Sequence, residues 1–101
     1  MKTLSEGANL RELPDLPQSV KEFFVTAFEI PPLWHVKIQA AFQEYTDNAV
    51  SKTINFPSDA TKDQVKEAYL LAYREKCKGI TIYRSGSKAG QVLACGTKQV
   101  C

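Results

Sequence analysis

The sequence has little net charge, few cysteines and a single histidine, and each shortage excludes a class of protein. A formal net charge of +2 is too small to indicate binding to nucleic acid or to a membrane surface. Three cysteines without a Cys-x-x-Cys pair make neither a disulfide framework nor, with one histidine, a zinc site. No apolar run approaches the roughly 20 residues of a membrane span, and we find no signal-peptide core. We therefore expect a cytoplasmic protein without DNA, RNA or a membrane as partner.

What is present is ordinary for a folded domain. The chain has 101 residues, of which 44% are hydrophobic and 24% charged. This length allows one domain with a modest core.

The segment from Trp34 to Pro57 changes its period halfway. Up to Ala49 the large apolar residues follow helical spacing, which predicts one stripe of an α-helix. The stripe consists of Trp34, Ile38, Ala41, Phe42, Tyr45 and Ala49. From Val50 the period is two, and Pro57 cannot continue a strand ladder. We therefore predict a helix that hands over to a strand at residues 50–56.

The predicted strand has one apolar face and one face of small polar side chains. Lys52 shares the first face with Val50, Ile54 and Phe56. The polar face consists of Ser51, Thr53 and Asn55. Such a row suits the closed polar interior of an α/β barrel, with a plain solvated face as the alternative.

A second helix and a second strand follow. Thr61 and Gln64 have capping-box spacing, and Gly79 is a natural C′ residue, so we predict a helix over about 62–77. Its predicted buried stripe is Val65, Ala68, Tyr69, Ala72 and Tyr73. The strand over 80–84 would add Thr81 and Tyr83 to the polar face. Strand, helix and strand with short joints predict a βαβ unit with parallel strands.

The ends of the chain are less patterned. Residues 1–16 resemble an extended connector, and a helix from Pro17 to about Phe28 is predicted to stop before Pro31-Pro32. The stretch 94–101 has the composition of a flexible tail. A two-stranded parallel sheet cannot stand alone, so the chain either oligomerises or is a piece of something larger, and we favour the second.

Three short segments of this sequence carry a family resemblance: QAAFQ, TDNAVSKTIN and GITIYRSGS. With them, about residues 24–93 resemble the C-terminal end of the catalytic subunit of adenosylcobalamin-dependent, class II ribonucleotide reductases. The resemblance implies an α/β fold, a βαβ unit from the end of a ten-stranded reductase-type barrel, with preceding helices and a flexible tail. Residues 17–93 would be the barrel portion.

The resemblance also implies a chemistry. Family members reduce ribonucleotides to deoxyribonucleotides through a thiyl radical, with adenosylcobalamin as cofactor and thioredoxin or a similar reductant as partner. Ser51, Thr53, Asn55, Thr81 and Tyr83 would line the substrate chamber. The family's radical cysteine, its oxidised cysteine pair, its catalytic Asn and Glu and its phosphate loop are all missing from this chain. We therefore expect it to be inactive alone and to need the remaining reductase chain or subunit.

Several single residues have two interpretations. His35 is a packing or capping residue or a proton-transfer group, and Cys77 is expected to be an inert thiol. Tyr83 either fills the barrel mouth or relays a radical. In the iron-dependent relatives that the resemblance brings in, two adjacent tyrosines form such a relay. This chain has Arg84 at the second position, so we expect no relay. Arg84 and Lys88 either meet a phosphate or the cobalamin tail or belong to a solvated loop.

The tail contains Cys95 and Cys101. Family members commonly carry a C-terminal cysteine pair that passes electrons from thioredoxin to the active site, and five intervening residues permit a disulfide. Two unpaired thiols of no consequence are the alternative. For the whole chain three hypotheses remain: a fragment or separately encoded piece of the reductase, a non-enzymatic fold fragment or interaction module, and a small thiol carrier.

Overall fold

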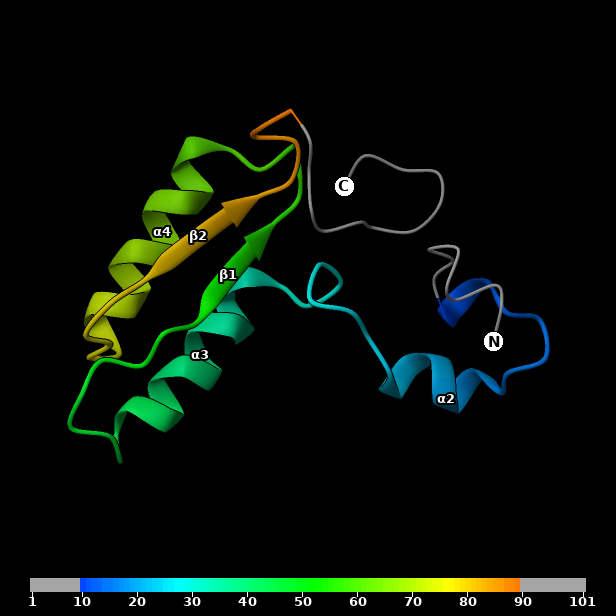
Figure 1. Ribbon diagram of the computed structural model, residues 1–101, viewed down its shortest axis with the longest axis horizontal. Helices are drawn as coiled ribbons and strands as arrows, with labels where there is room; N and C mark the ends of the chain where they lie inside the picture. The colour runs from blue at the N-terminus through cyan, green and yellow to red at the C-terminus, as the bar shows by residue number, and fades with distance from the viewer. Residues whose placement is uncertain (1–9, 90–101) are drawn as a thin grey trace.

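The computed structural model describes residues 10–89, in which a short N-terminal segment leads into a βαβ unit (Figure 1). Predictions for residues 1–9 and for the cysteine-containing tail 94–101 lie outside the described residues. The elements in chain order are a 3₁₀ helix η1 (Leu10–Glu12), α2 (Gln18–Phe23), α3 (Pro32–Gln43), β1 (Thr53–Phe56), α4 (Lys62–Arg74) and β2 (Thr81–Arg84).

The two strands pair in parallel, as the short joints around α4 predict. Thr53 lies opposite Thr81, and Asn55 lies opposite Tyr83. Ile54 is paired with Ile82 in the same ladder. Since side chains alternate along a strand, each face of this small sheet is formed by matching positions of β1 and β2.

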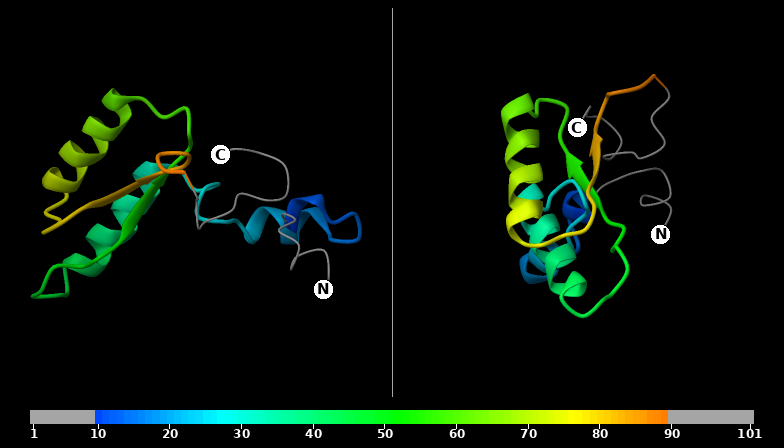
Figure 2. Two further views of the ribbon diagram at one scale, coloured as in Figure 1. Left: turned by 45° about the horizontal axis from the view of Figure 1, so that its top comes forward. Right: turned by 90° about the vertical axis from the view of Figure 1, so that its left-hand side faces the viewer.

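Both long helices cover one face of the sheet (Figure 2). A small core lies between them and the strands, formed by Val36, Ile54, Phe56, Ala68 and Ala72. The other face carries no helix among residues 10–89. The unit is therefore half of a layered α/β arrangement, with helices on one face of the sheet and no helix of residues 10–89 on the other.

α4 begins and ends with specific capping interactions. The Gln64 N–H donates to Thr61 Oγ1 over 3.3 Å while the Thr61 N–H donates to Gln64 Oε1 over 2.8 Å, which confirms the capping box. At the C-terminus the Cys77 N–H donates to the Ala72 carbonyl over 2.9 Å. Lys76, with φ of 60°, occupies the left-handed C′ position of this Schellman motif.

Two predictions for α4 are therefore wrong. The helix ends at Arg74 instead of about Cys77, because Lys76 and not Gly79 turns the chain. Tyr69 and Tyr73, placed by us in the buried stripe, are exposed. They lie on the flank of α4, while the smaller Ala68 and Ala72 meet the core.

α3 starts at the Pro31-Pro32 pair as predicted but ends at Gln43, six residues before Ala49. Its buried side carries His35, Val36, Gln39 and Gln43. The apolar stripe that begins at Trp34 lies on another side: 54% of Trp34 and 67% of Phe42 is exposed. The large apolar residues of α3 therefore do not form the core of this chain.

Both strands are shorter than predicted because side chains of α3 form hydrogen bonds with the backbone groups that precede each strand. The Val50 N–H donates to Gln43 Oε1, and the Val50 carbonyl accepts from Gln39 Nε2. Gln39 Nε2 also donates to the Gly79 carbonyl, one residue before Ile80. Residues 50–52 and Ile80 consequently lie outside the ladder that we predicted for them.

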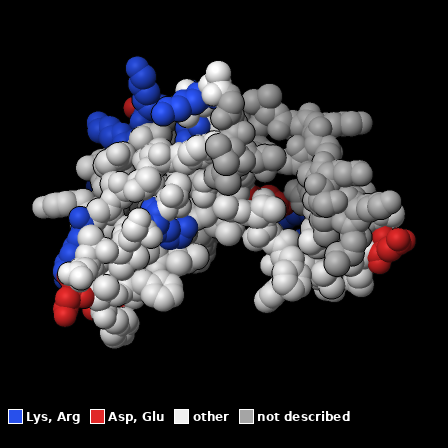
Figure 3. Space-filling model, viewed as in Figure 1, with Lys and Arg blue, Asp and Glu red and all other residues white. Residues whose placement is uncertain are grey.

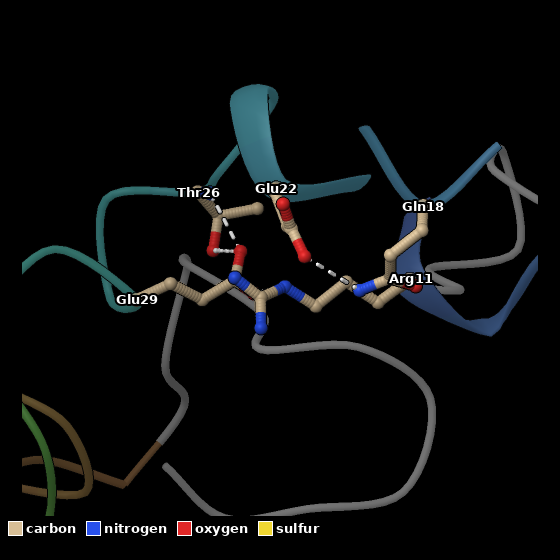
Figure 4. Close-up of polar contacts among 5 residues, drawn as sticks. All are labelled: Arg11, Gln18, Glu22, Thr26 and Glu29. Atoms are coloured by element: carbon tan, nitrogen blue, oxygen red, sulfur yellow. Dashed lines mark hydrogen bonds and ion pairs between the residues drawn. The ribbon is translucent and has the colours of Figure 1, made fainter. Parts of the chain in front are cut away.

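The first helix is also shorter than predicted. α2 ends at Phe23, and Phe24 is extended. The reason lies in the next turn, where Glu29 Oε2 accepts from both the N–H and the hydroxyl of Thr26, at 2.7 and 2.9 Å (Figure 4). Such local bonds compete with helix continuation. Arg11 forms an ion pair with the same carboxylate at 2.6 Å, which ties η1 to the turn.

In residues 10–89 no helix is both long and apolar enough to span a membrane.

Candidate functional site

The helix-free face of the sheet carries most of the polar residues that the sequence singled out. By register and alternation, Thr53, Asn55, Thr81 and Tyr83 share this face. Ser51 precedes β1 and is exposed. Viewed from this side, the surface over the sheet is mostly uncharged, with one group of Lys or Arg atoms near its middle (Figure 3). We call Thr53, Asn55, Thr81 and Tyr83 the polar face.

Asn55 is the buried member of the polar face. Only 8% of it is exposed, and its Oδ1 has no hydrogen-bond partner in the part of the chain that the structure describes. Its strand neighbour Tyr83 is half-buried, with its ring centroid 6.2 Å from that of Phe28. A buried amide oxygen without a donor is costly, so this position is suited to a donor from outside residues 10–89.

Two glutamines of α3 hold the segments that enter the strands. Gln43 Nε2 donates to the carbonyls of Thr46 and Asn48, each over 2.9 Å, and its Oε1 accepts from Val50 N over 3.0 Å. Gln39 Nε2 donates to Val50 O over 3.1 Å and to Gly79 O over 2.7 Å. These two side chains position both strands relative to α3.

The sequence contained a signal for these glutamines that we did not use. Gln39 and Gln43 are four residues apart and therefore share the helix side of Val36. Two long amides on one side of a helix, opposite an apolar stripe, indicate that this side meets backbone instead of solvent. The segment QAAFQ, which carries part of the family resemblance, contains this pair.

His35 and Lys52 form a second buried connection. His35 is 2% exposed, its Nε2 lies 2.8 Å from the Ala27 carbonyl, and its Nδ1 lies 2.8 Å from Lys52 Nζ. A carbonyl can only accept, so Nε2 carries the proton and Nδ1 accepts from the ammonium. Burial, opposed by the bond to Ala27 and aided by the charge of Lys52, lowers the pKa of His35. Burial also lowers the pKa of Lys52.

This geometry supports the packing interpretation of His35. Both ring nitrogens are occupied within the chain, so the imidazole has no free nitrogen for proton transfer. Among residues 10–89 no cluster of three or more His, Cys, Asp or Glu side chains could hold a metal ion.

The remaining singled-out residues are placed as follows. Arg84 Nη1 donates to the Ser58 carbonyl over 2.7 Å, so it connects the end of β2 to the loop before α4. Burial, with Glu75 nearby, raises the pKa of the Cys77 thiol, which agrees with an inert thiol. Lys88 is exposed. Cys95 and Cys101 lie outside the described residues.

Chemically, the polar face offers hydroxyl, amide and phenol groups and no charged side chain. These groups can donate to and accept from a polar ligand and can orient it. They do not include a nucleophile with a neighbouring base or a charged group that would stabilise a transition state. The face is therefore suited to lining a chamber and unsuited to performing a reaction alone.

Comparison with known proteins identifies related chains. Residues 1–83 match the family model described as "Ribonucleotide reductase, barrel domain". The match begins at residue 1, so it extends further toward the N-terminus than the resemblance that we described from Phe24.

Curated relatives match almost the whole chain. A vitamin B12-dependent ribonucleoside-diphosphate reductase of Thermoplasma acidophilum is 50% identical over 99 residues, which are 98% of this chain and 13% of the relative. One of Mycobacterium tuberculosis is 47% identical over 91 residues, 90% of this chain and 13% of the relative. A vitamin B12-dependent ribonucleotide reductase of Streptomyces coelicolor is 36% identical over 100 residues, 96% and 10% respectively. The chain thus spans only 10–13% of the length of these relatives.

Proposed function

Because this chain belongs to the ribonucleotide reductase barrel-domain family, we propose that it is the C-terminal barrel portion of a B12-dependent ribonucleotide reductase. It is a fragment or a separately encoded piece, and a larger reductase chain completes the active site. The proposal rests above all on the polar face, which lies on the helix-free side of a parallel sheet that two strands cannot complete. In this proposal the face closes a ten-stranded barrel and lines its substrate chamber.

Each member of the polar face has a role that its groups allow. The hydroxyls of Thr53 and Thr81 and the phenol of Tyr83 orient a ribonucleotide by hydrogen bonds. The buried Oδ1 of Asn55, which has no partner within residues 10–89, accepts a hydrogen bond from the substrate or from the opposite wall. Ser51 extends the row at the strand entrance. These residues position the substrate, and the radical chemistry belongs to the larger chain.

We assign the cofactor to the larger chain as well. The relatives are named as vitamin B12-dependent, which supports adenosylcobalamin as the cofactor of the complete enzyme. The only histidine of this chain is bonded at both ring nitrogens within the chain, so we assign His35 no part in holding the cofactor.

The tail adds a second part to the proposal. We propose that Cys95 and Cys101 form a disulfide that thioredoxin or a similar reductant opens, and that they pass electrons to the buried active-site cysteines of the larger chain. In each exchange a thiolate of the reducing pair attacks the disulfide, which forms a mixed disulfide and releases one thiolate. The second thiolate of the reducing pair then attacks the mixed disulfide, so that the reducing pair becomes a disulfide and the other pair, having gained two electrons and two protons, becomes a dithiol.

A chimera tests the barrel assignment. The aligned segment of the Thermoplasma acidophilum relative is replaced by this chain, and adenosylcobalamin-dependent formation of deoxyribonucleotide is measured. We expect turnover within about ten-fold of the parent, because the two segments are 50% identical. The relative with its segment deleted is the control and should be inactive. A folded chimera that binds cobalamin but does not turn over would contradict the proposal and favour a non-enzymatic interaction module or a small thiol carrier.

A further inference from the structure

One side of α3 is buried in this chain, and a second side carries large apolar residues that are exposed. The covered side meets β1 and α4 and carries His35 and the two glutamines. The other carries Trp34, Ile38 and Phe42 and is continued by Tyr45 just after the helix; 54, 43, 67 and 87% of these residues is exposed. We call these four residues the α3 stripe. A helix that is buried along one side and carries large apolar residues on another is typical of the interior of a larger structure.

The stripe is of a size that an interface needs. A buried aromatic side chain covers about 150–250 Å², so the exposed parts of three rings and one isoleucine amount to on the order of 400 Å². A stable interface buries about 800 Å² per partner. The stripe thus supplies about half of such an interface, and a neighbouring strand edge can supply the rest.

The position of α3 in its layer indicates what covers the stripe. α3 packs against α4 along one flank and against β1 below. In Figure 1, α3 lies on the β1 side of the unit and α4 on the β2 side. Among residues 10–89 the edge of β1 that faces away from β2 has no strand partner. A parallel strand added at this edge would bring its crossover helix to about 10 Å from α3, on the uncovered flank.

From this geometry we propose that the α3 stripe is the docking surface for a helix of the larger reductase chain, whose attached strand pairs with the free edge of β1. The inference rests on the proposed function and names the surface through which the two chains associate. The relatives contain the necessary length, since this chain corresponds to only 13% of the Thermoplasma acidophilum reductase. The partner helix is apolar on the side that meets Ile38 and Phe42.

Binding of substituted chains tests the proposal. Each full 101-residue variant is co-expressed with the Thermoplasma acidophilum reductase lacking its aligned segment, and the affinity of the purified complex is measured. The double variant Ile38→Ser, Phe42→Ser should bind at least about thirty-fold more weakly, as expected for loss of central apolar anchors. Phe23→Ser, which removes an exposed ring of α2, is the matched control and should bind as wild type does.

A second measurement does not depend on substitutions in the stripe. Trp34 is the only tryptophan of the chain, so 5-fluorotryptophan places one ¹⁹F nucleus on the α3 stripe. Complex formation should shift its resonance and protect it from a soluble paramagnetic quencher.

The outcomes separate this inference from the proposed function. If wild type binds and the double variant binds equally well, or if Trp34 stays accessible in the complex, the α3 stripe is not the docking surface while the reductase assignment stands. If wild type does not associate with the reductase chain, the proposed function fails and the inference with it. If wild type instead forms a dimer that Ile38→Ser, Phe42→Ser abolishes, the occupant is a second copy and the inference is wrong.

Discussion

The Lys52 ammonium donates a hydrogen bond to Nδ1 of His35 over 2.8 Å, while Nε2 of the same ring bonds to the Ala27 carbonyl. A neutral imidazole thus joins three parts of the chain: the segment before α3, α3 itself and the entrance to β1. Protonation of Nδ1 would remove the acceptor and place two positive charges side by side.

This pair predicts a pH dependence of stability. The pKa of His35 is lowered in the folded state, so in mildly acidic solution the unfolded chain binds more protons than the folded chain. The stability is therefore present above the ordinary histidine pKa of about 6.5 and is lost as the pH falls below it. We expect the urea midpoint of the wild-type chain to fall between pH 7.5 and pH 5.5. In His35→Gln, which lacks the titrating ring, the fall should be clearly smaller. Equal slopes in the two proteins would contradict this account of the pair.

Gln43 is predicted to be a major stabilising residue although it is polar. Leucine at this position has a similar volume but leaves the carbonyls of Thr46 and Asn48 and the N–H of Val50 without their partner. We expect Gln43→Leu to lower the free energy of unfolding by about 1–2 kcal/mol, because the N–H of half-buried Val50 loses its partner while water can reach the carbonyls of the exposed residues Thr46 and Asn48. Urea denaturation measures it. Gln18→Leu, the same change at an exposed site, should cost under about 0.5 kcal/mol. Similar losses in both variants would show that the buried amide has no special role.

The end of α4 predicts a pair of glycine substitutions with opposite signs. Lys76 has φ of 60°, which glycine adopts without strain, so Lys76→Gly should raise the free energy of unfolding by about 0.5–1 kcal/mol. Its neighbour Glu75 has φ of −79°, and Glu75→Gly should lower it by a similar amount. Thermal unfolding followed by circular dichroism measures both. If the two variants shift in the same direction, Lys76 does not occupy the left-handed C′ position in solution.

The tail predicts a redox effect. In the chimera described above, changing both Cys95 and Cys101 to Ser should reduce thioredoxin-driven turnover by at least ten-fold. Turnover driven by dithiothreitol should change little, because a small dithiol reaches the active site directly. Mass spectrometry after mild oxidation should find a Cys95–Cys101 disulfide in the unsubstituted protein. Two thiols that never pair, or unchanged thioredoxin-driven turnover, would show that the tail carries no electrons.

The sequence predicted the fold where each pattern had a single physical cause. Thr61 and Gln64 are a complete capping box, and the two short period-two segments around α4 could only pair in parallel. The alternation along β1 also placed Thr53 and Asn55 on the side away from the helices.

Other features depended on contacts that a linear pattern does not reveal. The apolar spacing of Trp34, Ile38 and Phe42 indicates an apolar helix side, but it does not indicate which other segment or chain packs on that side. The core side of α3 is set by Gln39 and Gln43, whose amides replace ladder bonds before both strands. Likewise, Lys76 takes a conformation for which Gly79 was the better candidate by residue type. At the strand entrances a tertiary contact overrode local preference, whereas at Lys76 the local hydrogen bonds of the Schellman motif did.

The most direct test of the account is a turnover assay with the two chains separate and together. The purified 101-residue chain, the larger reductase chain without its aligned segment, and their co-expressed complex are each supplied with ribonucleotide, adenosylcobalamin and reductant. The account predicts no deoxyribonucleotide from either chain alone and adenosylcobalamin-dependent product from the complex. Turnover by the 101-residue chain alone, or a stable complex without turnover, would contradict it.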